Sequence, residues 1–500
     1  MRVLISFLLL SLLPVWGATQ KHDNVWTLGY GSSEVTNLVG GTNINFNVSP
    51  PDTSYVFRSM NFTYNVASVS DAQGNLLFYS DGCFIAGADN QAILNGDSIN
   101  PGPLHDEYCW FGYLASQGSF FLPHPADSNL YYLIHLGLNN IEPVYGLGEY
   151  LYFTLIDRRL DGGRGGVVLK NQVLLEQWLS FGLLAGVRHA NGRDWWIVCS
   201  GMESNTHYFF LLTPMDITFS HTQDHGQISL DDNGTGRNTF SPDGKWFARY
   251  DRYNHLNLFQ FDRCTGRFSE NYYDEIPISP DSIILTGGVE FSANSRFLYV
   301  VTNLWIHQYD LEADDIIASR QRVATWNGLL SPHPTYFFMP QRGPDGKIYI
   351  SCTNSVNVLH VIHQPDLPGT ACQVEQGGLK LPTYNCFSTP YFPNYRLGAL
   401  PMEDCDSLSI NPGIDPELSY QLFPNPFEDY LDLNLEGAHS GNYQVQLTDA
   451  LGHLIIRESI NHLGWDKTYR VPIRNLPQGI YFYSLQYQGK IIGSGKLVRQ

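Results

Sequence analysis

The sequence of 500 residues predicts an all-β protein, and three observations carry that prediction. Aromatic residues make up 14% of the chain, and residues typical of turns are abundant, with 46 Gly and 28 Pro. Charged residues are only 15%, against roughly 25% in an average soluble protein. A strand–turn–strand pattern also recurs at intervals near fifty residues. Strands favour aromatic side chains and the hairpins between them favour Gly and Pro, so all three observations agree.

The net charge of −19 excludes nucleic acid as a partner, because no basic surplus exists to neutralise phosphates. The charge is also uneven along the chain. Residues 420–500 hold seven acidic and seven basic residues, so the whole excess lies in residues 1–419. This difference predicts a domain boundary near residue 415.

The first 18 residues have the pattern of a secretory signal peptide. Met1-Arg2 precede an apolar run over 3–13, and small residues follow at Gly17 and Ala18. The run is too short to span roughly 30 Å of hydrocarbon, and no later stretch reaches 18 apolar residues. We therefore expect an exported protein without a transmembrane helix.

The repeat consists of an apolar strand, a turn rich in Asp, Asn, Pro and Gly, and an aromatic strand. Its six copies occupy residues 69–79, 124–132, 188–196, 240–247, 291–299 and 343–350. Aligned on Gly74, Asn129, Gly192, Gly244, Ser295 and Gly346, the successive steps are 55, 63, 52, 51 and 51 residues. The Pro-Asp-Gly turns suit a hairpin, because Pro presets φ and Gly accepts φ > 0.

A unit of about fifty residues with several strands is typical of a β-propeller blade. One further step reaches back to His22 and another forward to Gly398, so residues 24–60 and 377–400 are expected to combine as a seventh blade. Such closure removes exposed sheet edges. Seven blades are favoured, and six or eight stay open. The propeller is expected to occupy 19–400.

The chain then changes character. Residues 401–419 contain Pro401, Pro412, Gly413 and Pro416 and are predicted to be a linker. Alternating apolar residues such as Leu431, Leu433 and Leu435 then indicate short strands. About seven strands over 420–500 predict a small immunoglobulin-like β-sandwich.

This last segment resembles the type A C-terminal sorting domain of the type IX secretion system of Bacteroidetes. The residues that carry the resemblance are Pro424, Asn425, Pro426, Gly452, Gly479, Tyr481 and Lys496, in that order at the end of the chain. The resemblance implies export through the periplasm and recognition of residues 420–500 by the type IX secretion machinery. The cargo is then expected to be secreted or held on the outer-membrane surface.

Residues 24–410 resemble a group of exported propeller-like proteins with the same kind of tail. The matching stretches are residues 74–79, 188–196, 261–266 and 343–349. This second resemblance implies architecture and export, but no activity.

One cluster of residues suggests a ligand site. Arg188, His189, Arg193, Asp194 and Trp195 gather charge and an aromatic ring at one turn of a charge-poor chain. Arginine forks and aromatic stacking suit an anionic or sugar ligand. Alternatively, Arg193 pairs with Asp194 while the tryptophans fill the blade core.

Metal and catalytic patterns are weak. His221 and His225 have helical spacing but lie in a predicted loop between blades, and His360 and His363 lie on a predicted strand that points them apart. No metal site or cofactor is predicted, although Asp231, Asp232 and Asn233 offer oxygen ligands of the kind that Ca²⁺ prefers. The glycine-rich stretch 161–166 is predicted to be an interblade turn. No catalytic residue is assigned.

Eight cysteines agree with an oxidising destination, and none forms a C-x-x-C pair. Proximity in the chain predicts the disulfides Cys83–Cys109 and Cys372–Cys386, with Cys405 as a rival partner for Cys372. Cys199, Cys264 and Cys352 are expected to be buried thiols.

The function expected from these patterns is binding or adhesion at the cell surface by an exported propeller with an unidentified glycan or protein ligand. The alternatives are a propeller enzyme, a glycan hydrolase or lactonase with its site in the central channel, and a structural component of the surface or motility apparatus. The sequence leaves catalysis undecided but favours a protein that is not an enzyme.

Overall fold

The computed structural model describes residues 20–32, 36, 38–141, 144–229, 236–277, 279, 287–387, 389–401, 419–436, 441–448, 454–462, 467–473, 476–487 and 490–499. The predicted signal peptide and most of the predicted linker lie outside these residues. Strands dominate the described part of the chain. Its helical segments are α1 (Pro103–Tyr108), η1 (Asp161–Gly163) and η2 (Gly369–Cys372).

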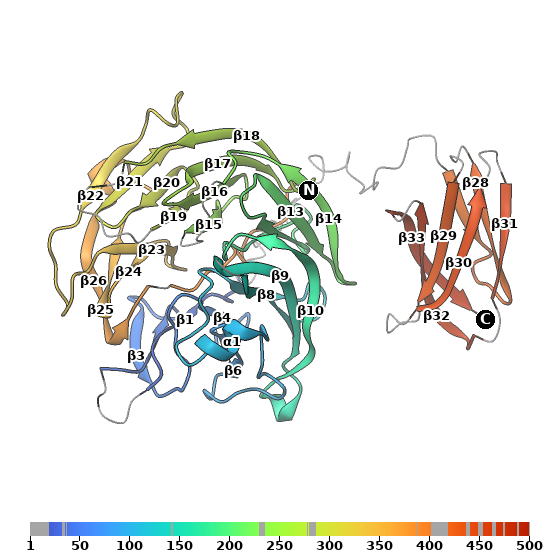
Figure 1. The fold of residues 1–500 in the computed structure, drawn as a ribbon, viewed down its shortest axis with the longest axis horizontal. Coiled ribbons are helices and arrows are strands. Elements are labelled where there is room, and N and C mark those ends of the chain that lie inside the picture. The colour runs from blue at the N-terminus through green and yellow to red at the C-terminus, as the bar shows by residue number, and fades with distance from the viewer. Residues whose placement is uncertain are drawn as a thin grey trace, which may run out of the picture. The chain divides into compact units, whose positions relative to one another are not determined.

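Seven antiparallel sheets, the blades, surround one axis in the described part of residues 20–401 (Figure 1). Two blades have three strands. Blade 1 contains β1 (Val25–Gly29), β2 (Gly41–Asn45) and β3 (Asp52–Val56). Blade 2 contains β4 (Ala67–Ser70), β5 (Leu76–Ser80) and β6 (Ile85–Gly87).

The other five blades have four strands each. Blade 3 contains β7 (Ser119–Pro123), β8 (Leu130–Ile141), β9 (Val144–Asp157) and β10 (Gly166–Leu179), and blade 4 contains β11 (Ala185–Arg188), β12 (Trp195–Ser200), β13 (Thr206–Leu212) and β14 (Ile217–Asp224). Blade 5 contains β15 (Arg237–Phe240), β16 (Trp246–Asp251), β17 (His255–Asp262) and β18 (Arg267–Asp274). Blade 6 contains β19 (Gly288–Phe291), β20 (Phe297–Val301), β21 (Trp305–Asp310) and β22 (Gln321–Thr325). Blade 7 contains β23 (Phe337–Arg342), β24 (Ile348–Cys352), β25 (Val356–Ile362) and β26 (Val374–Asn385).

The repeated turns occupy equivalent places, as the 51-residue step predicts. Gly244 lies between β15 and β16, the first two strands of blade 5, and Gly346 lies between β23 and β24, the first two strands of blade 7. The other four aligned turns also join the first two strands of their blades. The first strand of blades 5, 6 and 7 lies nearest the axis (Figure 1). The β-propeller with seven blades is therefore confirmed.

The predicted closure of the ring is wrong in detail. Blade 1 is built from residues 25–56 alone, and residues 374–385 form the outer strand of blade 7. Hydrogen bonds join the two blades: the Thr42 and Thr383 hydroxyls are 2.7 Å apart, and the Asn385 side chain accepts the N–H of Gly29 at 3.2 Å. The Tyr384 N–H also donates to the carbonyl of Leu38 at 2.9 Å. The glycine-rich stretch 161–166 is also misplaced, because it joins β9 to β10 within blade 3.

The C-terminal segment forms a separate sandwich with seven described strands, as predicted. One sheet contains β27 (Ser419–Phe423), β28 (Tyr430–Glu436) and β31 (Lys467–Pro472), and the other contains β29 (Gly441–Thr448), β30 (Leu454–His462), β32 (Gly479–Tyr487) and β33 (Lys490–Arg499). Leu431, Leu433 and Leu435 are fully buried in its core, which confirms the period-2 pattern.

The chain divides into two compact units at residue 402. Within the described residues, no helix combines the length and apolar character that a membrane span requires.

Candidate functional site

The chain's own residues 389–400, here called the strap, cross the middle of the ring (Figure 1, orange). The strap enters where the inner strands begin, because the Thr389 hydroxyl accepts a hydrogen bond from Arg237 at the start of β15 (2.8 Å). It leaves at the face of the repeated turns, where the Leu400 N–H donates to the carbonyl of Ala190 (2.8 Å).

Two buried tyrosines fix the middle of the strap. The Tyr391 hydroxyl accepts the N–H of Gly186 on β11 at 3.2 Å. The Tyr395 hydroxyl donates to the carbonyl of Phe121 on β7 at 2.8 Å. The strap thus occupies the channel in which a propeller enzyme would hold its substrate.

An ion pair ties the strap to blade 1. The Arg396 guanidinium lies 2.6 Å from the Asp23 carboxylate and also donates to Asn24 at 2.9 Å. Trp26 of β1 packs against Phe392, with ring centroids 5.9 Å apart. Blade 1 is therefore held to the rest of the ring by the strap as well as by blade 7.

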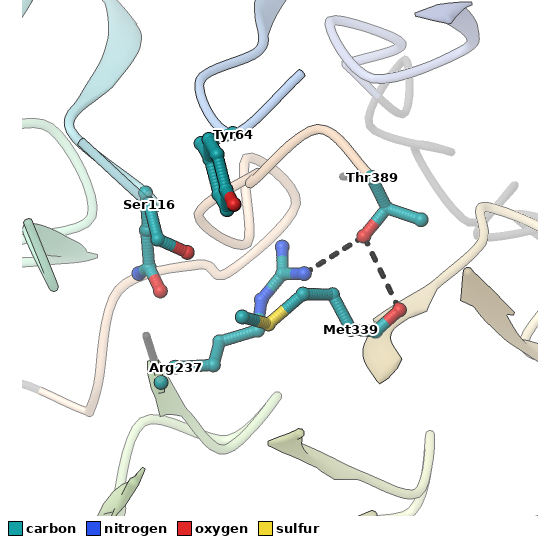
Figure 2. Close-up of a pocket in the computed structure, with 7 residues that line it drawn as sticks. Tyr64, Ser116, Arg237, Met339 and Thr389 are labelled. Carbon is teal, nitrogen blue, oxygen red and sulfur yellow. Dashed lines mark hydrogen bonds between the residues drawn. The ribbon is translucent and has the colours of Figure 1, made fainter. Parts of the chain in front are cut away.

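Figure 2 shows a cavity at the mouth of the channel where the inner strands begin. Its lining residues are Tyr64, Ser116, Gln117, Gly236, Arg237, Met339 and Thr389. The cavity has room for about one water molecule. Burial lowers the pKa of Arg237 to about 10, so its guanidinium remains charged at neutral pH.

The predicted ligand cluster at the third repeat is largely engaged within the protein. Arg188 is 6% exposed, donates to the carbonyls of Gly192 and Arg193, and stacks on the Trp195 ring at 4.2 Å. Arg193 forms an ion pair with Asp194 at 2.7 Å, and Trp195 is fully buried.

His189 is partly buried beside this cluster, and burial lowers its pKa. The structure therefore has the arrangement given as the alternative, and the ligand-binding role of these residues stays a prediction.

The histidine pairs do not converge on a metal. His221 lies on β14 and not in a loop, stacked on Phe209 at 4.6 Å. His360 is buried on β25, whereas His363 follows the strand and contacts Glu375 at 2.7 Å. No group of three potential metal ligands occurs in the part of the chain that the structure describes. Asp231, Asp232 and Asn233 lie outside it.

The cysteines agree only in part with the predicted pairs. Cys83 and Cys109 form a disulfide, as predicted. The pair Cys372–Cys386 is wrong, because both side chains are free, buried thiols. The 12-residue strand β26 separates them, and an extended strand of that length spans roughly 40 Å, far beyond a disulfide's reach. Cys264, expected to be a thiol, is disulfide-bonded.

An aromatic and acidic surface lies on the outer strands of blade 3, here called the blade 3 rim. Tyr150 and Tyr152 stack with ring centroids 5.4 Å apart, and the Tyr150 hydroxyl lies 3.4 Å from the Glu176 carboxylate. Glu149 accepts a hydrogen bond from Asn139 at 2.7 Å. Trp178, which lies on β10 with Glu176, is 58% exposed. The charges of Glu149 and Glu176 raise the pKa of Tyr150.

The sorting-type residues lie at one end of the sandwich where they are described. Asn425 accepts the N–H of Val498 at 2.9 Å, so the Pro424-Asn425-Pro426 segment is tied to the last strand. The Tyr481 hydroxyl donates to the carbonyl of Pro477 at 2.8 Å. Gly479 begins β32, and Lys496 lies on β33 opposite Phe482. Gly452 is outside the described residues.

Neither the strap nor Arg237 was predicted from the sequence. Polar residues on inner strands offered a signal: Arg237, Glu290 and Gln341 are each nearly fully buried on the first strand of a blade. Charged and polar residues on the inner strands of a propeller indicate a built polar centre. The partners of Arg237 lie 104 to 153 residues away in the chain, which no local pattern reveals.

The family model of the secretion system C-terminal sorting domain matches residues 421–499. No curated protein matches the chain. A solved structure from Lactobacillus plantarum is 11% identical and covers 74% of this chain and 99% of its own, with a TM-score of 0.45. A putative 6-phosphogluconolactonase from Bacteroides uniformis is 11% identical over 73% of this chain and 98% of its own, with a TM-score of 0.43.

A third solved structure, the Dos1 propeller, is 13% identical over 66% of this chain and 87% of its own, with a TM-score of 0.35. The assignment of the fold rests on the seven sheets themselves. Residues 421–499 belong to the family of secretion system C-terminal sorting domains, and the chain is thus a propeller protein exported by the type IX secretion system to the cell surface or beyond it.

Proposed function

We propose that the exported propeller binds a glycan through its outer surface and is not an enzyme. The observation that carries this proposal is the strap, which fills the central channel with the chain's own side chains. The cavity that remains at its mouth holds about one water molecule, whereas ligand sites for small molecules are usually several hundred Å³.

Within the described residues, the buried contact between a thiol and an imidazole also argues against catalysis. The Cys352 sulfur lies 3.3 Å from His360 Nε2, and both residues are inaccessible. His360 Nδ1 accepts the N–H of Gly377 at 3.2 Å, so the ring proton is on Nε2, which donates to the carbonyl of Thr335 at 2.7 Å. A nitrogen that already carries a proton cannot activate the thiol as a base.

The blade 3 rim supports binding of a sugar. The stacked rings of Tyr150 and Tyr152 and the exposed ring of Trp178 offer flat apolar faces. The carboxylates of Glu149 and Glu176 offer hydrogen-bond acceptors beside those faces. Aromatic faces suit the C–H faces of a sugar, and carboxylates suit its hydroxyl groups.

A glycan array with the exported full chain tests this proposal. We expect the wild type to bind one class of glycan, and Trp178→Ala to weaken that binding about fivefold, since one stacked ring contributes about 1 kcal/mol. Trp110→Ala is the matched control, because Trp110 is 74% exposed near α1, outside the rim.

Three outcomes would contradict the proposal. One is that the wild type binds no glycan, and another is that Trp110→Ala loses as much binding as Trp178→Ala. The third is release of sugar products from the bound glycan, measured by mass spectrometry, which would show an enzyme. Binding that is restricted to proteins would replace the glycan with a protein partner.

A further inference from the structure

Arg237 is a buried cation that forms no ion pair with any residue the structure describes. Its side chain is 2% exposed at the start of β15. It donates to the Thr389 hydroxyl at 2.8 Å, to the Gln341 side-chain oxygen at 2.6 Å and to the carbonyl of Pro390 at 2.9 Å. All three acceptors are neutral. Its Nε, also buried, has no partner among the described residues.

The carboxylate of Glu290 does not serve as the ion-pair partner of Arg237. Glu290, 2% exposed, is near enough to act on the Arg237 charge. Its two oxygens accept the backbone N–H groups of Phe291 and Arg342, at 2.9 and 3.0 Å, and it forms no ion pair with Arg237. Burial raises the pKa of Glu290, while the charges of Arg342 and Arg237 oppose that rise. Buried charges in proteins are normally paired, because removing a lone ion from water costs several kcal/mol.

The cavity at the channel mouth lies against this guanidinium. Figure 2 shows the Tyr64 hydroxyl pointing into the space beside Arg237. That hydroxyl has no hydrogen-bond partner in the part of the chain that the structure describes, so it is free to donate. Burial raises the pKa of Tyr64, which keeps its proton at neutral pH. The cavity therefore offers a positive charge, a hydroxyl donor and room for one small group.

We propose that a small monovalent anion binds in this cavity against Arg237 and Tyr64. The ligand presents a single negatively charged atom about the size of a water molecule. A free halide ion or one oxygen of a carboxylate has this chemistry. The anion neutralises the buried guanidinium and thereby stabilises the junction between the strap and the inner strands. This proposal is independent of the glycan proposal, because the cavity and the blade 3 rim share no residue.

Arg58 offers a matched contrast within the same ring. It is also 2% exposed and donates only to neutral groups, the carbonyl of Thr42 and the side chain of Asn43. Its guanidinium lies over two aromatic rings, 5.2 Å from the centre of Phe62 and 5.4 Å from that of Tyr79, whereas the Arg237 guanidinium lies over one, Tyr391, at 5.7 Å. It does not line the cavity. A variant at Arg58 should therefore lower stability without changing the response to anions.

The test measures the melting temperature of the full chain as chloride, bromide or formate replaces gluconate at constant ionic strength. Gluconate is too large for the cavity. We expect chloride and bromide to raise the melting temperature with saturation, by about 2 °C at ten times the half-saturating concentration. The rise should persist in Arg58→Lys and vanish in Arg237→Gln. Tyr64→Phe should raise the half-saturating concentration about fivefold, since one hydrogen bond is lost.

A bromide-soaked crystal of the wild type gives a second measurement that depends on no variant. An anomalous peak beside Arg237 supports the proposal, even if Arg237→Gln fails to fold. A rise with formate but not with chloride also supports the anion site and assigns it to a carboxylate source. An equal rise in Arg237→Gln, or no anion dependence together with no bromide peak, overturns the proposal.

Discussion

Five of the six aligned turn positions have a backbone conformation with positive φ, which favours glycine. Gly74, Gly192, Gly244 and Gly346 all have positive φ, and Ser295 has φ of 64°. The sixth position, Asn129, is not among the positive-φ residues. Ser295 adopts a conformation that favours glycine, and its hydroxyl accepts the N–H of Asp243 on the neighbouring blade at 3.0 Å.

Two glycines at equivalent turns separate backbone strain from packing. Gly244 has φ of 73° and Gly346 has φ of 81°. An alanine at either position would be held at positive φ, which costs about 1 kcal/mol of stability. A Cβ at Gly346 would meet nothing closer than 3.7 Å, whereas at Gly244 it would lie 2.5 Å from Arg263 and 2.9 Å from Leu397 of the strap. We expect Gly244→Ala to lower the free energy of unfolding by about 3 kcal/mol and Gly346→Ala by about 1.

Denaturant unfolding of both variants checks this difference. Equal losses would mean that the strap does not pack against the Gly244 turn.

Asp81 should make stability depend on pH. Burial raises the pKa of Asp81 to about 7, although its carboxylate accepts the N–H groups of Cys83 and Phe84. Since the pKa is higher in the folded than in the unfolded state, the folded protein holds the proton more tightly. Below about pH 4 the carboxyl is protonated in both states and does not lower the free energy of unfolding. As pH rises to about 7, it lowers the free energy of unfolding progressively.

Asp81→Asn removes this titration and retains an oxygen that can accept both hydrogen bonds. The free energy of unfolding of the variant minus that of the wild type should increase between pH 4 and 7, by on the order of a few kcal/mol. Urea unfolding at a series of pH values measures the difference. A difference that does not change with pH would contradict a buried carboxyl whose pKa is raised.

At the scale of elements, the blades were predictable and the closing segment was not. The inner hairpins repeat a turn chemistry that acts locally, so a constant step of 51 residues reveals them. Residues 389–400 were expected to complete a blade. Pro390 and Pro393 have no N–H to donate to a ladder, which disfavours a strand here. The segment forms the strap instead, and its side chains contact blades 1, 3, 4 and 5.

The disulfides were likewise predictable only where local sequence determines the structure. Cys83–Cys109 was predictable because a turn-rich segment joins the two cysteines, whereas an extended strand holds Cys372 and Cys386 apart. The centre around Arg237 could not be predicted, because its partners come from β23 and the strap. Contacts at such separations are set by the ring, not by local sequence.

The strap should decide whether the ring closes. A chain that stops after Asn385 lacks the Arg396–Asp23 ion pair and the buried rings of Tyr391 and Tyr395. We expect it to be insoluble or to melt at a much lower temperature than a chain that stops after Pro401, which is the matched control. Within the full chain, Tyr395→Ala should lower the free energy of unfolding by about 3–5 kcal/mol.

Thermal and denaturant unfolding of these chains make the comparison. If the chain ending at Asn385 melts like the one ending at Pro401, blade 7 and blade 1 suffice to close the ring.

At the scale of the whole molecule, charge and structure divide the chain at nearly the same place. The excess of negative charge lies before residue 420, and the compact units separate at residue 402. Each unit has a core of its own, because the described buried side chains of the sandwich form one hydrophobic cluster and those of the propeller form others. Two units with separate cores are expected to fold independently. The sorting domain can then serve as an address for a propeller that has already closed.

Deletion of residues 420–500 is therefore expected to leave a folded propeller in the periplasm, with the melting temperature that the propeller has in the full chain. Fusing the same residues to an unrelated periplasmic protein should carry that protein to the cell surface or the medium. Cell fractionation and surface proteolysis measure both results, and a fusion to the propeller's residues 320–400 is the control that should stay inside. The assignment of residues 420–500 as an independent address is wrong if the truncated chain still reaches the surface. It is also wrong if the ring fails to fold without them, because a domain with its own core should not need the address that follows it.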